Sequence, residues 1–236
     1  MSCRFLLLLI ATHFATVAYA QDWPRRPVRM VVPFAAGGGN DISARIIAQP
    51  LTEEFGQQFI IDNRPGAAGN IGMEIVARSQ PDGYNIMVGN VSTNAINPTG
   101  FKSVLKFDPV NDLVAVTMIA RIPNLLVSGV GFPPNSMKEF IEYAKARPGQ
   151  LNYSSPLGGY SHMDMLDFNA KEGLKMVNIP SRGAGASFAA IIAGEIHASF
   201  MNAATSMPQV KGGRMKAFAT TAQKRLGELA RGADHE

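Results

Sequence analysis

Three consecutive glycines at residues 37–39 follow an apolar run and precede residues with helical spacing. Because glycine has no Cβ, this loop can turn sharply and point several backbone N–H groups at one spot. The positive end of the helix dipole lies there too, and Asn40 and Asp41 suit the N-cap and the first turn. The arrangement favours binding of a carboxylate or a phosphate. A plain capped turn is the alternative, since one glycine loop is a weak signal.

The same order of strand, polar loop and helix recurs along the first half of the chain. A strand over residues 58–62 leads into the loop 63–70, N-R-P-G-A-A-G-N, and a helix over 71–78. A third strand over 84–88 ends at the polar loop 89–94. Alternating strands and helices predict parallel pairing, with ligands bound beyond the carboxyl ends of the strands. All three loops are predicted to share that edge.

The second half of the chain repeats the pattern after a predicted domain crossover. Strand-like runs cover residues 114–122 and 125–130, and a helix with a capping box begins at Ser136. Polar loops follow at residues 155–161 and 180–185, and a further strand ends at Asn202. In the second of these loops, Arg182 can give a carboxylate two parallel hydrogen bonds or be a solvated surface arginine. Asn202 can bind a ligand or cap a turn. Residues 215–221 are predicted as a strand that returns to the first domain.

No catalytic arrangement accompanies these loops. The chain lacks a G-x-S-x-G elbow and a Walker A lysine, and its glycines do not have dinucleotide-binding spacing. His162, His197 and His235 are far apart in sequence and have no cysteine partners, which argues against a metal site. Ser161 adjoins His162, but neighbours in sequence rarely face each other, so an N-cap explains Ser161 better. We expect binding loops without a catalytic residue, a cofactor or a metal.

The N-terminal residues predict export. Residues 1–20 contain an early Arg4, a short apolar run and an A-Y-A site, which is typical of a secretory signal peptide and too short for a membrane span. Cys3, the only cysteine, lies inside this segment, so an ordinary hydrophobic core must stabilise the exported chain. The 22 basic residues exceed the 18 acidic ones only slightly and are scattered. We therefore expect no nucleic-acid partner and no membrane-embedded segment.

Longer motifs make a family recognisable. V-V-P-F-A-A-G-G-G-N-D, I-D-N-R-P-G-A-A-G-N-I-G, P-D-G-Y-N-I-M-V-G-N and I-P-S-R-G-A-G-A occur in that order. The sequence resembles the Bug family, the extracytoplasmic solute receptors of tripartite tricarboxylate transporters, over about residues 24–225. The resemblance implies an α/β, two-lobe periplasmic-binding-protein-like (type II) fold that closes on a small carboxylate. It also implies a monomeric periplasmic protein that delivers its ligand to membrane permease subunits.

The loops and the resemblance together predict the domains and the site. Lobe one covers residues 24–122 and 216–236, and lobe two covers residues 123–215. The ligand, a di- or tricarboxylate, an amino acid or an aromatic acid, is expected between the lobes, with water between the loops and its carboxylate. The predicted ligand-binding residues are Phe34, Ala36, Gly37, Gly38, Asn40, Asp41, Gly66, Ala68, Gly69, Asn70 and Ser92 in lobe one, and Ser154, Ser161, His162, Arg182, Gly183 and Asn202 in lobe two.

Three features depart from the family pattern. Pro50 lies within the first predicted helix, where a kink or an early end is expected. Asn202 stands where the family often has an acidic residue, which bears on ligand charge. The resemblance fails after about residue 225, so lobe one is expected to be incomplete at the C-terminus. An exported enzyme acting on carboxylates and a non-functional truncated remnant are the alternative functions.

Overall fold

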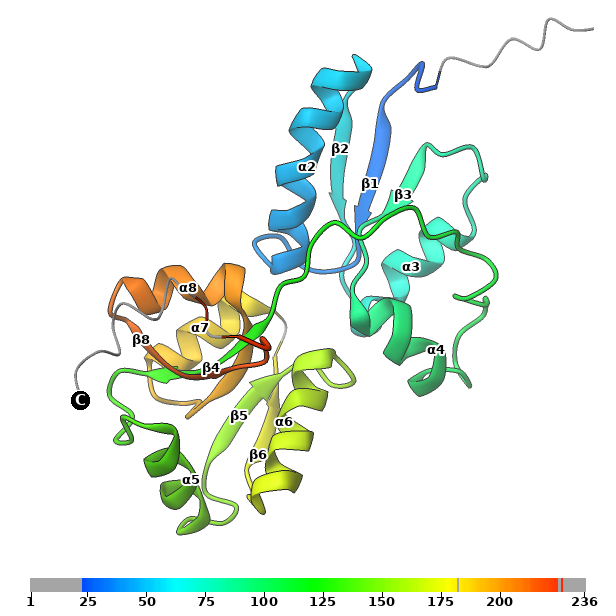
Figure 1. The fold of residues 1–236 in the computed structure, drawn as a ribbon. Helices are drawn as coiled ribbons and strands as arrows, with labels where there is room; N and C mark the ends of the chain where they lie inside the picture. The colour runs from blue at the N-terminus through cyan, green and yellow to red at the C-terminus, as the bar shows by residue number, and fades with distance from the viewer. Residues whose placement is uncertain (1–22, 182, 225, 227–236) are drawn as a thin grey trace, which may run out of the picture.

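The protein has two α/β lobes joined by the extended segment 113–123 (Figure 1). The computed structural model describes residues 23–181, 183–224 and 226. The predicted signal peptide lies outside these residues. Among the helices described, none has both the length and the apolar character required to cross a membrane.

Lobe one contains a three-stranded sheet that is parallel throughout, as predicted. Strand β1 (Val28–Val32) lies in the centre, with β2 (Phe59–Asn63) on one side and β3 (Asn85–Met87) on the other. Helix α2 (Gly39–Phe55) and helix α3 (Asn70–Ala77) cover opposite faces of the sheet (Figure 1). The three strands therefore end at the same edge.

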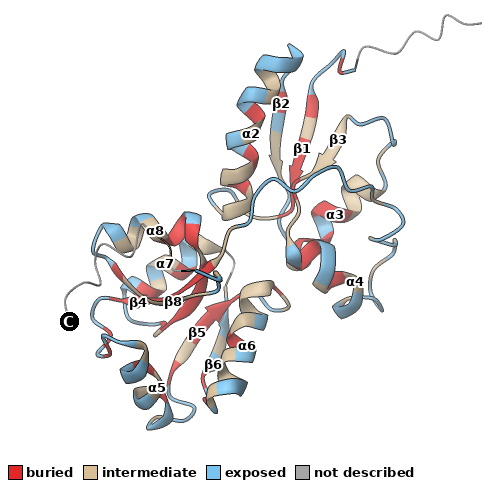
Figure 2. Ribbon diagram, viewed as in Figure 1, coloured by how far each residue is buried: buried red, intermediate tan, exposed pale blue. Residues whose placement is uncertain are grey.

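The alternation of side chains along β1 explains why both faces are covered. Val28, Met30 and Val32 point toward α2, where they pack against Ala44 and Ala48. The intervening Val31 is also fully buried. A central parallel strand is apolar on both faces because helices lie on both sides of the sheet. Figure 2 shows the resulting buried strip along the strand.

Helix α2 differs from its prediction at both ends. Gly38, and not Asn40, is the N-cap, and Asn40 lies within the first turn. The amide Nδ2 of Asn40 instead donates to the carbonyl oxygen of Val88, 2.9 Å away, so tertiary contacts outweigh its capping preference. The helix also continues past Pro50 to Phe55, so the expected early end is wrong. Gly56, with φ of 63°, ends it in the left-handed conformation.

The third loop of lobe one is shorter than predicted. A π-helical turn (Ser92–Ile96) begins within the expected loop 89–94 and continues into α4 (Asn97–Gly100). Short π-helical turns occur frequently at functional sites. The second loop contains a 3-10 turn (Ala67–Gly69) directly before α3.

Lobe two has a mixed sheet, so the parallel pairing predicted from the repeated pattern holds there only in part. Strand β4 (Asn124–Gly129) pairs antiparallel with β7 (Ser199–Asn202) and β8 (Met215–Thr220). Strand β5 (Asn152–Ser155) pairs parallel with β6 (Val177–Pro180), and a bridge between Tyr153 and Ala198 connects the two groups of strands.

Helices cover both faces of this second sheet. Along β4, Leu126 packs with Phe140 and Met165, whereas Leu125 and Val127 pack with Ile191 on the opposite face. Ser136 is the N-cap, as predicted, since its hydroxyl accepts from the backbone N–H of Glu139; the carboxylate of Glu139 accepts in return from Asn135, one residue before the cap. The helices are α5 (Met137–Lys145), α6 (Tyr160–Glu172), α7 (Ala184–Ile192) and α8 (Ala203–Lys211).

Two predictions about the crossover are wrong. The strand expected over residues 114–122 is absent: the segment has no regular structure, and Val114 and Val116 are 90% and 85% exposed. A strand needs a hydrogen-bonding neighbour, and no described strand pairs with residues 114–122. The second error concerns β8, which pairs with β4 in lobe two. Residues 216–220 therefore do not return to lobe one.

Candidate carboxylate-binding site

Asp41 organises the glycine loop at the end of β1. Its Oδ2 accepts from the backbone N–H of Gly37 at 2.9 Å and from Nε of Arg45 at 2.9 Å. Its Oδ1 accepts from Nδ2 of Asn63 at 3.0 Å, and that same amide donates to the carbonyl oxygen of Phe34. The carboxylate thus ties the loop to the first turn of α2 and to the end of β2.

These contacts keep Asp41 ionised. Burial alone would raise its pKa, but hydrogen bonds from Arg45, Gly37 and Asn63 outweigh burial and lower the pKa below its ordinary value. Both carboxylate oxygens are engaged within lobe one, and the residue is 3% exposed. Asp41 therefore positions the loop from inside lobe one.

The first turn of α2 offers donors without acceptors. Gly38 caps the helix without a side-chain hydrogen bond. The backbone N–H groups of Gly39, Asn40 and Asp41 have no acceptor among the described residues. The first N–H groups of a helix have no intrahelical partner, and the helix dipole makes this end attractive to anions. An anion at this position would supply the missing acceptors.

The second loop has an unusual backbone. Gly66, Ala67, Ala68 and Gly69 all have positive φ angles, of 131°, 46°, 56° and 94°. Alanine rarely adopts such values, and strained backbone of this kind gathers at functional sites. Successive N–H groups in a left-handed turn can form an anion-binding concavity.

The loops of lobe one meet and hold one another. A Cβ added to Gly69 would lie 2.7 Å from Cγ2 of Thr93 and 3.1 Å from Cζ of Phe34. Asn90 in the third loop donates from Nδ2 to Oδ1 of Asn40, 3.1 Å away. The carboxyl ends of β1, β2 and β3 thus carry one connected hydrogen-bonded surface.

Buried amides support the second loop from behind. Asn97 is fully buried and donates from Nδ2 to Oδ1 of Asn70 at 2.7 Å and to the carbonyl oxygen of Ala68 at 2.9 Å. Asn70, one of the predicted ligand contacts, is 8% exposed and receives this bond inside the lobe. Its side chain therefore holds the loop in place.

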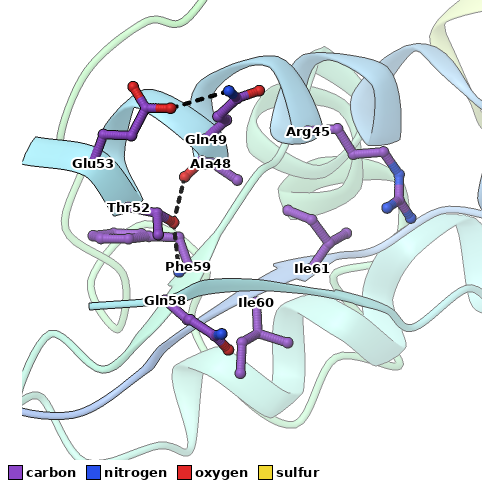
Figure 3. Close-up of a pocket in the computed structure, with 9 residues that line it drawn as sticks. All are labelled: Arg45, Ala48, Gln49, Thr52, Glu53, Gln58, Phe59, Ile60 and Ile61. Carbon is purple, nitrogen blue, oxygen red and sulfur yellow. Dashed lines mark hydrogen bonds between the residues drawn. The ribbon is translucent and has the colours of Figure 1, made fainter. Parts of the chain in front are cut away.

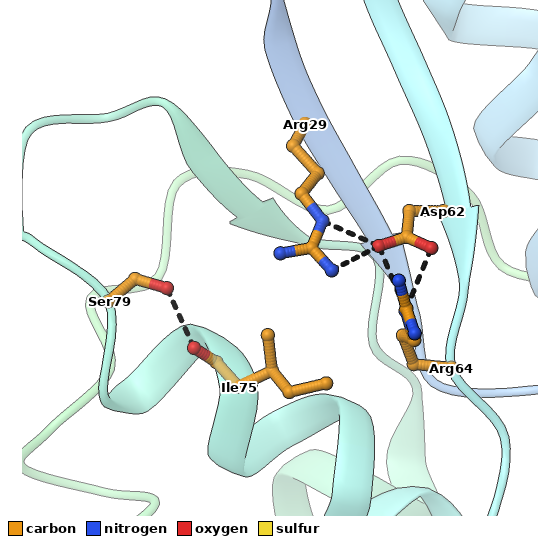
Figure 4. A network of polar contacts seen from close by, with 5 residues as sticks. All are labelled: Arg29, Asp62, Arg64, Ile75 and Ser79. Atoms are coloured by element: carbon orange, nitrogen blue, oxygen red, sulfur yellow. Dashed lines mark hydrogen bonds and ion pairs between the residues drawn. The ribbon is translucent and has the colours of Figure 1, made fainter.

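Charged side chains lie beside the loops on the sheet itself. Asp62 of β2 accepts from Arg29 of β1 at 2.5 Å and from Arg64 at 2.9 Å (Figure 4). Burial would raise the pKa of Asp62, but the two arginines lower it below its ordinary value. Figure 4 shows both guanidinium groups converging on one carboxylate, which leaves neither as a dedicated receptor for a ligand.

In lobe two, polar side chains of β5, α6 and α7 lie around the loop after β5. The hydroxyls of Ser154 and Ser187 lie 3.1 Å apart, and both residues are buried. His162 accepts at Nδ1 from the backbone N–H of Gly158 at 3.2 Å, and burial lowers the pKa of its imidazole. His162 thus fixes the turn before α6, and Gly159 caps that helix, not Ser161 as predicted.

The loops of the two lobes face each other. The Oγ of Ser92 in lobe one accepts from the backbone N–H of Tyr160 in lobe two at 2.9 Å. A Cβ on Gly39 would lie 2.7 Å from the side-chain amide of Asn202. A Cβ on Gly183 would lie 3.4 Å from the Cβ of Ala35. Residues predicted from both halves of the chain therefore converge on the first turn of α2.

The sequence-based site was incomplete. Arg182 lies outside the described residues, and Ala36 and Ser161 have no hydrogen bond there that would give them a role. Asn63, Asn97 and Tyr160 were not predicted, although all three shape the loops. Asn63 adjoins the N-R-P-G motif, and this position is the one signal that could have identified it.

Two cavities on lobe one do not lie at the first turn of α2. An open groove of about 520 Å³ lies between α2 and the edge strand β2, lined by residues such as Arg45, Gln49 and Ile60 (Figure 3). A second cavity, of about 320 Å³, is lined by Ala67 of the second loop, by α3 from Asn70 to Glu74 and by residues 101–106. The N–H groups without acceptors in the described part of the chain, and not the size of a cavity, mark the candidate site.

Comparison with known proteins agrees with this two-lobed architecture. Residues 43–231 match the family model described as "Tripartite tricarboxylate transporter family receptor". The chain belongs to this family, and its type II periplasmic-binding-protein fold confirms the resemblance seen in the sequence.

Individual relatives are moderately similar. A UPF0065 protein of Bordetella pertussis is 33% identical over 213 residues, covering 90% of this chain and 65% of that protein. Protein BugT of the same organism is 29% identical over 231 residues, covering 95% and 71%. The solved structure "R. palustris Rpa4515 with adipate" is 35% identical with a TM-score of 0.82, covering 86% and 68%. The chain thus spans about two thirds of the length of these relatives.

Proposed function

We propose that this protein is an exported solute receptor that binds a small organic carboxylate between its two lobes. The observation that carries the proposal is the first turn of α2, which lies beside Asn202 of lobe two and has three backbone N–H groups without acceptors among the described residues. Such a helix terminus holds a carboxylate through hydrogen bonds and the helix dipole.

The family indicates what happens to the bound ligand. Receptors of tripartite transporters deliver a ligand to permease subunits in the membrane, and we assign this partner to the chain on family grounds. The adipate in the related R. palustris structure supports a carboxylate as the ligand class. The signal peptide predicted from the sequence supports a periplasmic location for the receptor.

Calorimetry and thermal unfolding with a panel of di- and tricarboxylates test the proposal. A ligand that binds only the folded state raises the unfolding temperature, and the rise grows with the ratio of ligand concentration to Kd. We expect at least one small carboxylate to bind and to be recovered unchanged. Absence of binding across the panel, or conversion of the ligand to a product, would overturn the proposal.

A further inference from the structure

Four polar side chains gather in lobe two on the side that contacts lobe one. Asn124 begins β4 and lies opposite Asn202, the last residue of β7. Tyr160 and Asp164 lie one turn apart near the start of α6. We call these four residues the lobe-two polar cluster.

Direct contacts hold this cluster together. Nδ2 of Asn124 donates to Oδ2 of Asp164 at 2.5 Å, and Nδ2 of Asn202 donates to the hydroxyl oxygen of Tyr160 at 3.3 Å. Asn124 is 1% exposed, so its amide has a fixed orientation. Asn124 therefore positions the carboxylate of Asp164.

The cluster still has acceptor capacity. Oδ1 of Asp164 has no partner among the described residues, and Asp164 is only partly buried. Oδ1 of Asn124 is enclosed and also lacks a donor in the described part of the chain. Buried polar atoms are normally paired, and Oδ1 of the partly buried Asp164 is the acceptor suited to a group that donates hydrogen bonds, whereas Oδ1 of Asn124 is enclosed.

The charge of Asp164 is uncompensated within the described part of the chain. The ion pairs found there do not include Asp164, and Asp167, the nearest interacting charge on its own helix, has the same sign. Burial raises the pKa of Asp164, and the hydrogen bond from Asn124 opposes this rise. A ligand carboxylate close to this side chain would be repelled, whereas an ammonium or hydroxyl group would be attracted.

The cluster lies next to the proposed carboxylate site. The amide of Asn202 is 2.7 Å from where a Cβ of Gly39 would be, and Gly39 is the first residue of α2. The backbone of Tyr160 is held against lobe one by Ser92. A ligand whose carboxylate caps α2 would therefore extend its other substituents toward the cluster.

We infer that Asp164, positioned by Asn124, selects carboxylic acids that also carry a hydrogen-bond donor, an ammonium or a hydroxyl group, over plain dicarboxylates. This inference rests on the proposed function. It assigns the common anchoring step to the backbone of lobe one and the choice among acids to side chains of lobe two.

The test compares three four-carbon acids that differ in one substituent: succinate, malate and aspartate. Affinities are measured by calorimetry on the wild-type protein, on Asp164→Asn and on Asp167→Asn. Asp167 is an exposed carboxylate on the same helix, paired with Lys171, so its substitution removes the same charge while the hydrogen bonds of the cluster stay in place. A third variant, Asn124→Ala, removes the residue that positions Asp164.

We expect the wild-type protein to bind aspartate or malate at least about tenfold more tightly than succinate, as one charged hydrogen bond permits. Asp164→Asn should reduce that preference to about twofold while retaining succinate binding. Asn124→Ala should also weaken the preference for the substituted acids. Asp167→Asn should leave the preference unchanged. Whether aspartate or malate gains more affinity over succinate shows whether the site prefers an ammonium or a hydroxyl group.

Two outcomes would overturn the inference while the proposed function stands. One is a wild-type protein that binds succinate as tightly as the substituted acids. The other is an Asp164→Asn variant that folds with a normal unfolding temperature and keeps the full preference. If none of the acids, adipate included, binds to the wild-type protein, the proposed function itself fails.

Discussion

The two lobes differ in what they present to the cleft. Lobe one offers backbone: the N–H groups of Gly39, Asn40 and Asp41 have no acceptor among the described residues, while side chains such as Asp41 and Asn97 hold the loops from inside. Lobe two offers side chains, with Asp164 and Asn202 at its edge. Backbone donors recognise any carboxylate, whereas side chains vary with little effect on the fold. In the proposed receptor, anchoring and discrimination are therefore divided between the lobes.

Their cores differ as well. Lobe two has a cluster of aromatic rings around Phe140, with Phe132, Phe168 and Phe218 at centroid distances of 5.1–6.0 Å. The apolar cluster of lobe one around Val28 and Met30 contains mainly aliphatic side chains. Substitutions in one lobe can therefore be tested for their effect on stability and on ligand affinity separately from those in the other lobe.

The largest expected effect is on the core of lobe two. Phe140→Ala removes a fully buried ring, and such substitutions cost about 3–5 kcal/mol of unfolding free energy. Chemical denaturation followed by far-UV circular dichroism measures the loss. Leu166→Ala on α6, where the side chain is 45% exposed, is the control and should change stability little. An equally small change for Phe140→Ala would contradict the description of this core.

Gly69→Val should disturb the loops of lobe one. The residue has φ of 94°, and a Cβ would lie 2.7 Å from Thr93. Backbone strain and overpacking together amount to roughly 2–4 kcal/mol. Calorimetry should show carboxylate affinity lost for every ligand alike. Gly131→Val, where a Cβ would meet no atom within 4 Å, is the matched control. Unchanged affinity in Gly69→Val would refute anchoring by lobe one.

Asp41→Asn should weaken the loop without changing its size. The variant loses the charged acceptor shared by Gly37, Arg45 and Asn63. This loss should lower the free energy of unfolding by about 1–3 kcal/mol. The folded-state pKa of Asp41 is lowered, so its contribution is present above the unfolded value of 3.8 and is lost as pH falls through the lower folded value. The stability gap between wild type and variant should therefore narrow below about pH 4. Glu54 is exposed on the same helix, so Glu54→Gln, the control, should have the same stability as the wild type at every pH.

Acid should weaken discrimination by lobe two more than anchoring by lobe one. The pKa of Asp164 is raised by burial, against the opposing hydrogen bond from Asn124, with Asp167 adding to the rise. As pH falls through this raised value, Asp164 becomes neutral and its attraction for an ammonium group is lost. Aspartate affinity should decline by about tenfold relative to succinate, and Asp164→Asn should show no such decline. Parallel pH profiles for the two acids would argue against the inferred role.

The smallest expected effect concerns the contact between the lobes. Ser92→Ala removes the hydroxyl that accepts from the N–H of Tyr160 at the start of α6. Loss of one such hydrogen bond costs about 0.5–1.5 kcal/mol, so ligand affinity should fall several-fold for all acids. Thr99→Ala, an exposed hydroxyl on α4, is the control. A rise in affinity would show that this contact competes with the ligand.

Much of the fold was predictable because it depends on local pattern. The apolar run at β1, the glycines before α2 and the alternation of strands and helices predicted the parallel sheet of lobe one correctly. Pairing within lobe two was harder. Strand β8 reads like any other strand, and only its tertiary contacts place it beside β4. Residues 114–122 have strand-forming side chains, yet no described neighbour completes a ladder.

The sequence alone determined the family, the two-lobe fold class and the glycine loops, since each depends on residue types at short spacing. The tertiary structure decided which side chains have which task. It turned Asp41 inward, where three donors surround it, and it brought Asn124, Tyr160, Asp164 and Asn202 together from distant parts of the chain. The physical reason is that hydrogen bonds and charges act over a few ångströms in space. Distance along the chain does not specify such contacts until the sheets and helices have packed.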